Sequence, residues 1–282
     1  KIKSKNFKVV VDTVNGAAYK ALPELLEKLN CQVIKIHCDN NGMFPRGTEP
    51  IPSHLNDLSN AVIKHKADIG LATDPDADRL AIVNNNGAPI GEESTLVLAL
   101  ESYLKYYQDS QKVVTNLSTS MAVDVIAHKY NSTVERSFVG EINVVEKMKE
   151  TGSAIGGEGN GGVILKESHL GRDSLVASSL VLNNLAQSNL PLNKLMENIP
   201  RFVMIKDKIT LKNDVDFDHI KTLFQNDDDI SFIQGDGLKI LWKDKWVHIR
   251  KSNTEPIIRI ISEAIDSTTA KGLIDSIKHI VS

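Results

Sequence analysis

Apolar and polar residues alternate along the first part of this chain in a way that predicts strands and helices following one another. Short apolar runs flanked by turn residues have the length of buried strands, and longer stretches with apolar residues three or four positions apart have the period of helices. Over residues 1–89 we expect strands at 7–12, 33–36, 67–72 and 80–83 and helices at 17–29 and 55–64. This alternation predicts a parallel sheet, whose ligands gather at the carboxyl ends of the strands.

The same alternation starts again after the turn-forming run Asn84-Asn85-Asn86-Gly87. Over residues 90–199 we expect helices at 94–106, 121–129 and 142–149 and strands at 113–115, 133–137 and 154–155. A further helix follows, with Asp173 or Ser174 as its N-cap. The chain therefore has an α/β fold, with two successive α/β units of mostly parallel sheet that we place at residues 1–89 and 90–199.

The pattern changes after Pro200, where strands predominate. We expect strands at 202–211, 230–234, 238–242 and 246–250 and helices at 217–224 and 268–281. Asp236-Gly237 and Asp244-Lys245 have the composition of hairpin turns. These features predict a smaller α+β domain with an antiparallel sheet over residues 200–282, and we expect Trp242 and Trp246 in its core.

Composition restricts the classes of partner. The chain has 282 residues with 33 basic and 36 acidic side chains, so its formal charge of -3 provides no general field that would attract nucleic acid. No apolar run is long enough to cross a membrane, and the first residues do not form a secretory signal. Cys31 and Cys38 lack the spacing of a zinc site and suit a reducing compartment. We therefore expect a cytoplasmic protein without a nucleic-acid or membrane partner.

The most informative stretch is Asp74-Pro75-Asp76-Ala77-Asp78-Arg79, which follows one expected strand and precedes the next. Pro75 keeps the stretch out of a helix, so its alternating carboxylates come to one side of the backbone. Three negative charges this close repel one another, and a hard divalent cation with oxygen ligands is the simplest way to neutralise them. We therefore predict that Asp74, Asp76 and Asp78 hold a metal ion.

Three other interpretations compete with this one. An EF-hand loop starting at Asp74 would need glycine and glutamate where the chain has Arg79 and Asn85, so that interpretation fails. A phosphatase with Asp74 as its covalent nucleophile also fits an apolar strand followed by Asp-x-Asp. That alternative stays open. The third is an acidic surface turn without an ion, although solvated turns rarely carry three alternating carboxylates closed by an arginine.

The second α/β unit contains two stretches with candidate ligand-binding residues. The glycines of residues 156–162 let the backbone approach a ligand closely, and Glu158 can accept hydrogen bonds from sugar hydroxyls. A flexible turn explains these glycines equally well. Gly171-Arg172-Asp173 precedes a helix, and for Arg172 a phosphate contact and a surface ion pair are equally good interpretations.

A last stretch, Arg250-Lys251-Ser252-Asn253-Thr254-Glu255-Pro256, lies between two strands of the third domain. Guanidinium, hydroxyl, amide and backbone N–H donors gather in a turn that Pro256 ends, and Arg259 follows three residues later. A phosphate dianion requires such a set of donors. We predict a phosphate-binding loop here; the alternative is a polar hairpin tip with an accidental arginine.

In their order and spacing, these stretches resemble the motifs of the α-D-phosphohexomutase family, and the resemblance covers nearly the whole chain. The family includes phosphoglucomutases, phosphomannomutases and phosphoglucosamine mutases. The resemblance implies that Asp74, Asp76 and Asp78 bind Mg2+ and that Arg79 acts beside the reacting phosphoryl group. It also implies a set of substrate-binding residues, namely Glu158, Asn160, Arg172, Arg250, Ser252, Asn253, Thr254 and Arg259.

Family enzymes have four domains, and the first carries a phosphoserine that gives and takes the phosphoryl group. No such loop is recognisable here, because Ser118-Thr119-Ser120 lacks a following histidine and belongs to the second α/β unit. The chain also begins without methionine and enters a strand almost at once. We therefore expect domains two to four of a mutase, with the N-terminal catalytic domain absent and this fragment inactive by itself.

Two stretches depart from the family pattern. Asn160 and Gly162 stand where many members have serine and histidine, so the residue that acts as general acid or base is not assigned. Glu141-Ile142-Asn143 stands where several members have a basic residue.

The function implied by the resemblance is a magnesium-dependent transfer of phosphate between C1 and C6 of a hexose or hexosamine phosphate, through a phosphoserine enzyme and a sugar bisphosphate intermediate. The phosphate-binding loop would hold the phosphate that is not reacting. The loops favour phosphoglucosamine or phosphomannose as the sugar. Two alternatives remain, the phosphatase with Asp74 as nucleophile and a catalytically inert module that binds a sugar phosphate.

Overall fold

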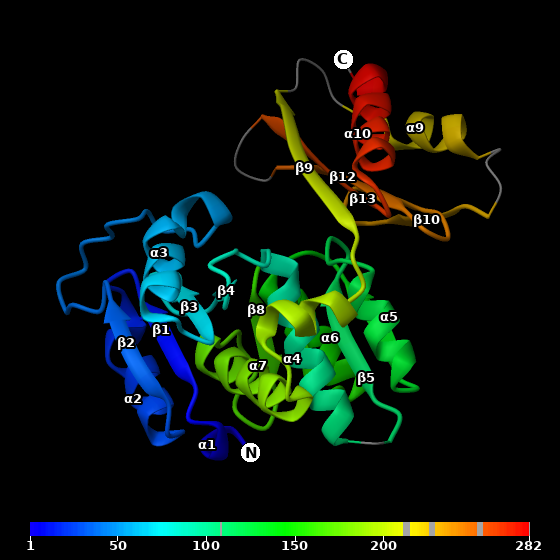
Figure 1. Cartoon of the computed structure of the whole chain (residues 1–282). Helices are drawn as coiled ribbons and strands as arrows, with labels where there is room; N and C mark the ends of the chain where they lie inside the picture. Colours follow the sequence, from blue (N-terminus) through cyan, green and yellow to red (C-terminus); the bar gives the residue numbers. More distant parts are fainter. Residues whose placement is uncertain (108, 211–214, 226–228, 253–255, 282) are drawn as a thin grey trace. The chain divides into compact units, whose positions relative to one another are not determined.

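The structure is a computed structural model that describes residues 1–107, 109–210, 215–225, 229–252 and 256–281. The chain divides into two compact units, which we call unit 1 (residues 1–119 and 123–200) and unit 2 (residues 120–122 and 201–282). Figure 1 shows the elements of both units. Among the described residues, no helix is both long and apolar enough to cross a membrane.

The first sheet of unit 1 has the strand order β2-β1-β3-β4. Its strands are β1 (Lys8–Asp12), β2 (Gln32–Ile36), β3 (Ile69–Thr73) and β4 (Leu80–Asn84), and its helical segments are α1 (Ile2–Lys5), η1 (Ala17–Tyr19), α2 (Ala21–Lys28), η2 (Pro52–His54) and α3 (Asn56–His65). β1 pairs in parallel with β2 and β3, and β4 runs antiparallel to β3. The helix expected from residue 17 begins at Ala21, because Pro23 lacks an N–H and is tolerated only in a first turn.

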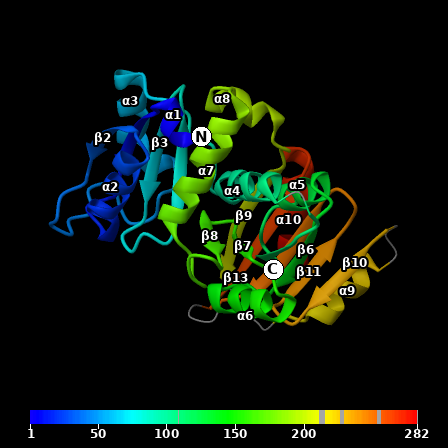
Figure 2. The ribbon, with the colours of Figure 1, turned by 90° about the horizontal axis from the view of Figure 1, so that it is seen from below.

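The second sheet of unit 1 has the order β6-β5-β7-β8. Its strands are β5 (Lys112–Asn116), β6 (Thr133–Ser137), β7 (Ile155–Glu158) and β8 (Gly162–Leu165). The helices are α4 (Glu92–Tyr106), α5 (Ala122–Lys129), α6 (Glu141–Thr151), α7 (Ser174–Ser188) and α8 (Leu192–Leu195), with a short η3 (Met196–Asn198). Helices α4 and α7 pack against each other (Figure 2). β5 is parallel to β6 and β7, whereas β8 is antiparallel to β7.

One sequence prediction fails in this second sheet. Residues 156–162 were expected as a loop, but Gly156 and Gly157 lie inside β7 and Gly162 begins β8, so only residues 159–161 make the turn. A Cβ at Gly156 would lie 2.6 Å from the backbone oxygen of Val114 and 2.8 Å from the sulfur of Met148. These glycines are therefore required by close strand and helix packing.

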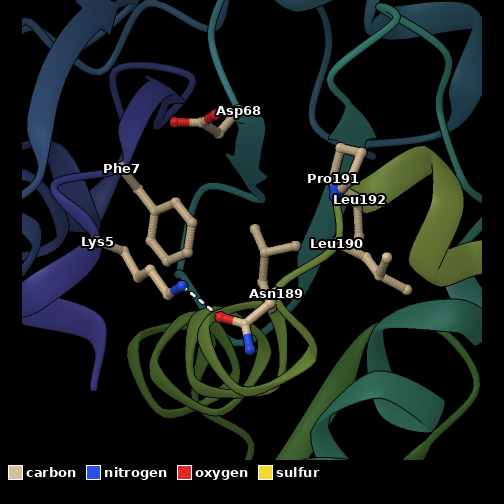
Figure 3. Close-up of a pocket in the computed structure, with 8 residues that line it drawn as sticks. Lys5, Phe7, Asp68, Asn189, Leu190, Pro191 and Leu192 are labelled. Carbon is tan, nitrogen blue, oxygen red and sulfur yellow. Dashed lines mark hydrogen bonds between the residues drawn. The ribbon is translucent and has the colours of Figure 1, made fainter.

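The two sheets of unit 1 are joined away from the strand ends that carry the acidic triplet. A hollow of about 220 Å³ is lined by residues of the N-terminal segment, by Asp68 directly before β3 and by the stretch after α7. Phe7, Asp68 and Leu190 are among the residues drawn in Figure 3. Lys5 Nζ donates to Asn189 Oδ1 at 2.5 Å across this hollow. Its charged groups thus already have partners, and we interpret it as a joint between the two halves of unit 1.

Unit 2 contains a five-stranded sheet in the order β10-β11-β12-β13-β9, with every pair antiparallel. The strands are β9 (Val203–Thr210), β10 (Ser231–Gln234), β11 (Leu238–Leu241), β12 (Trp246–Lys251) and β13 (Ile257–Ala264), and the helices are α9 (Phe217–Phe224) and α10 (Ser267–Val281). Trp246 is fully buried, and Trp242 packs against the core. The expected fold class, two α/β sheets followed by a smaller α+β domain, is confirmed.

Candidate functional site

The acidic triplet forms the turn between β3 and β4. One carboxylate oxygen from each of Asp74, Asp76 and Asp78 lies within 4.8 Å of the others, so the alternation read from the sequence does bring the three side chains together. Asp74 is buried, Asp78 is half-buried and Asp76 is exposed. Asp78 Oδ1 is buried and has no hydrogen-bond partner among the described residues. An all-carboxylate set with such an oxygen fits a hard divalent cation.

Neighbouring backbone holds this turn in place. Ala77 has a left-handed φ of 65°, and its N–H donates to the Asp74 carbonyl at 3.2 Å. The Ser174 N–H, at the start of α7, donates to the Ala77 carbonyl at 3.1 Å, and the Ala17 N–H donates to the Pro75 carbonyl at 2.7 Å. The turn is thus fixed from both α/β halves of unit 1, which limits how far its carboxylates can spread.

The carboxyl group of Asp74 is strongly affected by its burial. Burial raises the pKa of Asp74 to about 7, with further upward contributions from Asp78 and Asp76, while the Arg79 N–H bonded to Asp74 Oδ1 at 3.0 Å opposes the rise in this pKa. The negative charge is therefore costly here. A bound divalent cation would offset that cost directly.

Arg79 closes the acidic turn. Its Nε lies 3.6 Å from both Asp74 Oδ2 and Asp78 Oδ1, and its Nη1 pairs with Glu49 Oε2 at 2.5 Å. The side chain is partly exposed, with a relative accessibility of 26%. The guanidinium therefore lies beside the metal-binding carboxylates, where it can meet an anionic group that approaches them.

Two further residues support this turn, Arg46 and Glu49, both on the long loop between β2 and α3 and neither part of a motif that the sequence pattern singles out. Arg46 is buried; its Nε pairs with the fully buried Asp12 at 2.8 Å, and its Nη2 donates to the Thr73 carbonyl at 2.5 Å, one residue before the triplet. Glu49 is the partner of Arg79. The available signal was the length of the loop, because long loops in compact domains are usually functional.

Glu158 lies at the end of β7 and is buried. Its Oε1 accepts hydrogen bonds from Asn116 Nδ2 at 2.7 Å and from the Gly140 N–H at 3.1 Å, and its Oε2 accepts from Arg172 Nη1 at 2.8 Å. Three donors fix the position of this carboxylate. Glu158 is thus a hydrogen-bond acceptor in a fixed position at the carboxyl end of β7. A residue that orients a sugar needs such a fixed position.

The turn after Glu158 is tightly packed. The Gly159 N–H donates to Thr119 Oγ1 at 3.1 Å, and a Cβ at Gly159 would lie 2.0 Å from a carboxylate oxygen of Glu93. Asn160 is half-buried, and its Oδ1 accepts from the Gly162 N–H at 3.2 Å. The glycines therefore bring backbone close to side chains of unit 1 and do not make a loose turn.

Arg172 connects the two sheets. Its Nη2 pairs with Asp78 of the acidic turn, its Nη1 with Glu158, and its Nε with Glu141 Oε2 at 3.2 Å. Only 12% of the side chain is accessible. The sequence left a phosphate contact and a surface ion pair as equally good interpretations of Arg172. In the structure, Arg172 forms ion pairs, and these pairs are largely buried. Glu141, at the start of α6, is a further residue of the site.

In unit 2, Arg250 and Arg259 face each other in the register of β12 and β13. Arg250 Nε pairs with Asp236 Oδ1 at 2.9 Å, while Arg259 is exposed and lines a hollow of about 550 Å³ together with Lys208. The Ser252 N–H donates to the Ile257 carbonyl at 2.9 Å. The predicted residues Asn253 and Thr254 lie outside the described part of the chain.

His248 lies next to this basic region. Its ring is buried, and Nε2 bonds to the Asp236 carbonyl at 2.8 Å. Burial lowers the pKa of His248 to about 4, and the positive charges of Lys239 and Arg250 act on this pKa in the same direction. The imidazole is therefore neutral at neutral pH, so it adds no charge to the arginines and lysines around it.

Family models match nearly all of the chain. Residues 1–87, 91–202 and 205–280 match alpha/beta/alpha domain II, alpha/beta/alpha domain III and the C-terminal domain of phosphoglucomutase/phosphomannomutase. The chain belongs to the phosphoglucomutase/phosphomannomutase family. The resemblance to phosphohexomutases predicted from the motifs is therefore confirmed.

Among curated relatives, a phosphoglucosamine/phosphogalactosamine mutase of Sulfurisphaera tokodaii is 32% identical over 286 residues, covering 100% of this chain and 63% of the relative. A phosphoglucomutase/phosphomannomutase of Thermococcus kodakarensis is 34% identical, covering 96% of this chain and 59% of the relative. This family member thus spans about three fifths of the length of these mutases.

Solved structures agree on the fold. A phosphoglucomutase/phosphomannomutase family protein of Burkholderia thailandensis has a TM-score of 0.84 at 24% identity, covering 99% of this chain and 62% of that protein. A putative phosphomannomutase of Thermus thermophilus has a TM-score of 0.78 at 22% identity, with 99% and 62% covered. At these identities, the likeness shows that this chain shares their fold.

Proposed function

We propose that this chain supplies the metal-, sugar- and phosphate-binding parts of a magnesium-dependent phosphohexomutase. The reaction moves phosphate between C1 and C6 of a hexose or hexosamine phosphate through a sugar bisphosphate. The phosphoryl group is given and taken by a phosphoserine of a further domain that is not part of this sequence. In the first half, the serine Oγ–P bond breaks as a sugar hydroxyl oxygen, losing its proton, bonds to phosphorus and forms the bisphosphate. In the second half, the serine oxygen bonds to the other phosphorus of the bisphosphate as the bond between that phosphorus and its sugar oxygen breaks, and the freed sugar oxygen takes up a proton. The fragment alone is therefore inactive.

One observation supports this proposal most strongly. Three carboxylates that fit a hard cation lie beside Arg79 and are connected by Arg172 to Glu158 on the neighbouring sheet. Asp74, Asp76 and Asp78 would hold Mg2+, which when bound neutralises charge on the transferring phosphoryl group. Arg79 adds positive charge at the same place. Cation, guanidinium and a fixed hydrogen-bond acceptor are the groups that phosphoryl transfer to a sugar requires.

The remaining residues orient the substrate. Glu158 accepts hydrogen bonds from ring hydroxyls, and Asn160 offers amide groups from the same turn. In unit 2, Arg250, Ser252 and Arg259 hold the phosphate that is not reacting, together with Asn253 and Thr254. A distal phosphate bound in this way positions the reacting end without taking part in the chemistry.

A phosphatase with Asp74 as nucleophile is less well supported. Asp74 is 5% exposed, its Oδ1 accepts from the Arg79 N–H, and its Oδ2 faces Arg79 Nε. A nucleophilic oxygen must be open to the phosphorus atom that it attacks. Both oxygens of Asp74 point instead toward groups of their own turn, which suits a metal ligand better.

The names of the relatives guide the choice of sugar. One is named for phosphoglucosamine and phosphogalactosamine, and another for phosphoglucose and phosphomannose. We propose phosphoglucosamine as the first substrate to test, with phosphomannose and phosphoglucose beside it. These sugars differ at C2, so the test has to include all of them.

The direct test uses this chain and measures binding of glucose 1,6-bisphosphate and glucosamine 1,6-bisphosphate by calorimetry with and without Mg2+. We expect binding that Mg2+ strengthens, and an Asp76→Asn variant that loses the strengthening. Asp39→Asn, which removes an exposed carboxylate of the same half of unit 1, is the matched control. Absence of binding under all conditions would contradict the proposal.

A second test concerns turnover. Domain I of the Thermococcus kodakarensis relative, fused before Lys1, would supply the phosphoserine. We expect conversion of 1-phosphates to 6-phosphates, measured by phosphorus NMR, and its loss in the Asp76→Asn fusion. A fusion that binds the bisphosphate yet never turns over any of the three sugars would instead favour an inert sugar-phosphate-binding module. Trapping of phosphate on Asp74 would favour the phosphatase.

A further inference from the structure

The backbone around Arg172 is held by contacts that do not involve the acidic turn. The neighbouring Asp173 caps α7, accepting from the Leu175 N–H at 2.7 Å. The Arg172 N–H donates to Glu141 Oε1 at 3.1 Å, and Arg172 Nε pairs with the other oxygen of the same carboxylate. Glu141 thus clamps both ends of the arginine, and the orientation of the planar guanidinium is set from α6.

The space for the arginine stem comes from a glycine. A Cβ at Gly162 would lie 2.2 Å from Arg172 Cδ, so any side chain at this position would displace the arginine. The aliphatic part of the Arg172 side chain therefore packs on Gly162 at the start of β8, and the guanidinium lies between the two sheets. A larger residue at position 162 would therefore change every contact that the guanidinium makes.

The two terminal nitrogens of Arg172 bind carboxylates from different sheets, Glu158 through Nη1 and Asp78 through Nη2. A guanidinium is a rigid fork, so the two contacts cannot adjust independently. Asp78 Oδ2 pairs with Arg172, while Asp78 Oδ1 lies 3.6 Å from Arg79 Nε and has no hydrogen-bond partner among the described residues. A shift of the fork toward or away from Glu158 therefore re-aims Asp78 Oδ1.

We propose that Arg172 is a positioning residue that couples the cation site to the sugar loop. A ligand that takes up hydrogen bonds of Glu158 changes the hold of Arg172 on Asp78, and with it the affinity of the triplet for a divalent cation. By thermodynamic linkage, the bound cation changes the affinity for that ligand by the same factor. The identity of the two ligands rests on the proposed function, but the coupling between Glu158 and the cation site does not.

The coupling is testable in this chain with Mn2+ alone, followed by electron paramagnetic resonance. In Glu158→Gln, Arg172 loses a charged partner and holds Asp78 more strongly. We expect the dissociation constant for Mn2+ to rise about fivefold or more, the lower end of common coupling between sites. In Arg172→Gln, the same change at Glu158 should alter the dissociation constant less than about twofold. Glu150→Gln, an exposed acid of α6, is the control for loss of one negative charge.

The Arg172→Lys background separates geometry from simple charge. Lysine keeps the positive charge but has no fork, so a purely Coulombic effect of Glu158 on the cation would persist there, whereas coupling through Arg172 would disappear. This conservative variant also serves if Arg172→Gln does not fold. Equal effects of Glu158→Gln in the wild-type and Arg172→Lys backgrounds would overturn the proposal, as would failure of the chain to bind Mn2+.

Failure of the proposed function has a different signature. If the domain I fusion turns over none of the sugar phosphates while the effect of Glu158→Gln on Mn2+ binding still depends on Arg172, the coupling stands and the mutase function falls. If the fusion is active but Mn2+ binding is insensitive to Glu158, the mutase function stands and the coupling falls.

Discussion

The acidic turn of unit 1 and the basic region of unit 2 are built in opposite ways. The carboxylates of the turn are held by Arg79 of the same turn and by two cationic side chains from distant segments, Arg46 through the backbone and Arg172 directly. Arg250 and Arg259 instead lie opposite each other because two neighbouring strands are in register. The first region depends on a network of tertiary contacts, whereas the second depends mainly on strand pairing.

This difference predicts how each region responds to substitution. In a buried network of ion pairs, removing one member leaves another charge without a partner, and effects reach beyond the altered residue. On the sheet face of unit 2, a substitution leaves few buried partners without a contact, so its effect stays with the immediate neighbours on the strands. The predictions that follow test this contrast, beginning with the largest expected effect.

Arg46→Met should produce the largest loss of stability. The substitution leaves the fully buried Asp12 with His37 as its remaining ion-pair partner and removes a donor to the Thr73 carbonyl. Breaking one side of a buried ion pair costs about 3–5 kcal/mol. Urea unfolding measures the change, and Lys20→Met, in an exposed pair, should change stability by less than about 0.5 kcal/mol. A loss below about 1 kcal/mol for Arg46→Met would mean that the network is not cooperative.

Acid should destabilise unit 2 through His248. Its pKa is lowered in the folded chain from 6.5 to about 4, so the unfolded chain binds the proton more readily. The stability present above pH 6.5 is lost as the pH falls toward 4, by up to about 3 kcal/mol. Unfolding followed by fluorescence of Trp242 and Trp246 reports on this unit. His248→Gln, which keeps an N–H donor, should flatten that part of the pH profile; an unchanged profile would assign the acid sensitivity to other groups.

Arg250→Ala should weaken binding of glucose 1,6-bisphosphate to this chain by roughly tenfold or more, because hydrogen bonds between charged groups contribute about 1.5–3 kcal/mol. Calorimetry gives the affinity, and Arg250→Lys should lie between alanine and wild type, because lysine retains the charge without the fork. Because Arg250 and Arg259 lie opposite each other in the register, Arg259→Ala combined with Arg250→Ala should depart from the sum of the two free-energy losses. An exact sum would show that the two arginines act independently.

Glu49→Gln should have the smallest effect on stability. Glu49 is more than half exposed, and such ion pairs contribute less than about 1 kcal/mol. The thermal midpoint should therefore hardly move. Because Glu49 is the partner of Arg79 Nη1, the fusion with domain I should nevertheless lose turnover with little change in substrate affinity. A large stability loss would place Glu49 in the structural network together with Arg46.

The fold was predictable because its buried strands are apolar runs. β1, β3 and β4 have nearly every residue buried, which is why their positions could be read directly from the sequence. β8 was not predicted, because it starts with Gly162 in a glycine-rich run that has no pattern typical of a strand. Its glycines are explained by close contacts that only the folded chain reveals.

The candidate site was predictable where its residues are neighbours in sequence. The triplet and Arg79 form one short turn, so spacing alone indicated their proximity. Arg46 contacts a carbonyl 27 residues away, and Arg172 contacts Asp78 across 94 residues. Such partners are set by tertiary packing, and residue type alone left phosphate and carboxylate open as partners of Arg172.

Gly16 is a position at which no side chain fits. A Cβ at this position would lie 2.5 Å from the Pro75 carbonyl oxygen and 2.7 Å from Pro75 Cα, both backbone atoms that cannot step aside. The backbone at Gly16 thus packs directly against the backbone at Pro75, almost sixty residues later in the chain. A laboratory selection for a new metal preference should accordingly recover substitutions at positions 74, 76 and 78, whereas position 16 should return glycine in every surviving clone.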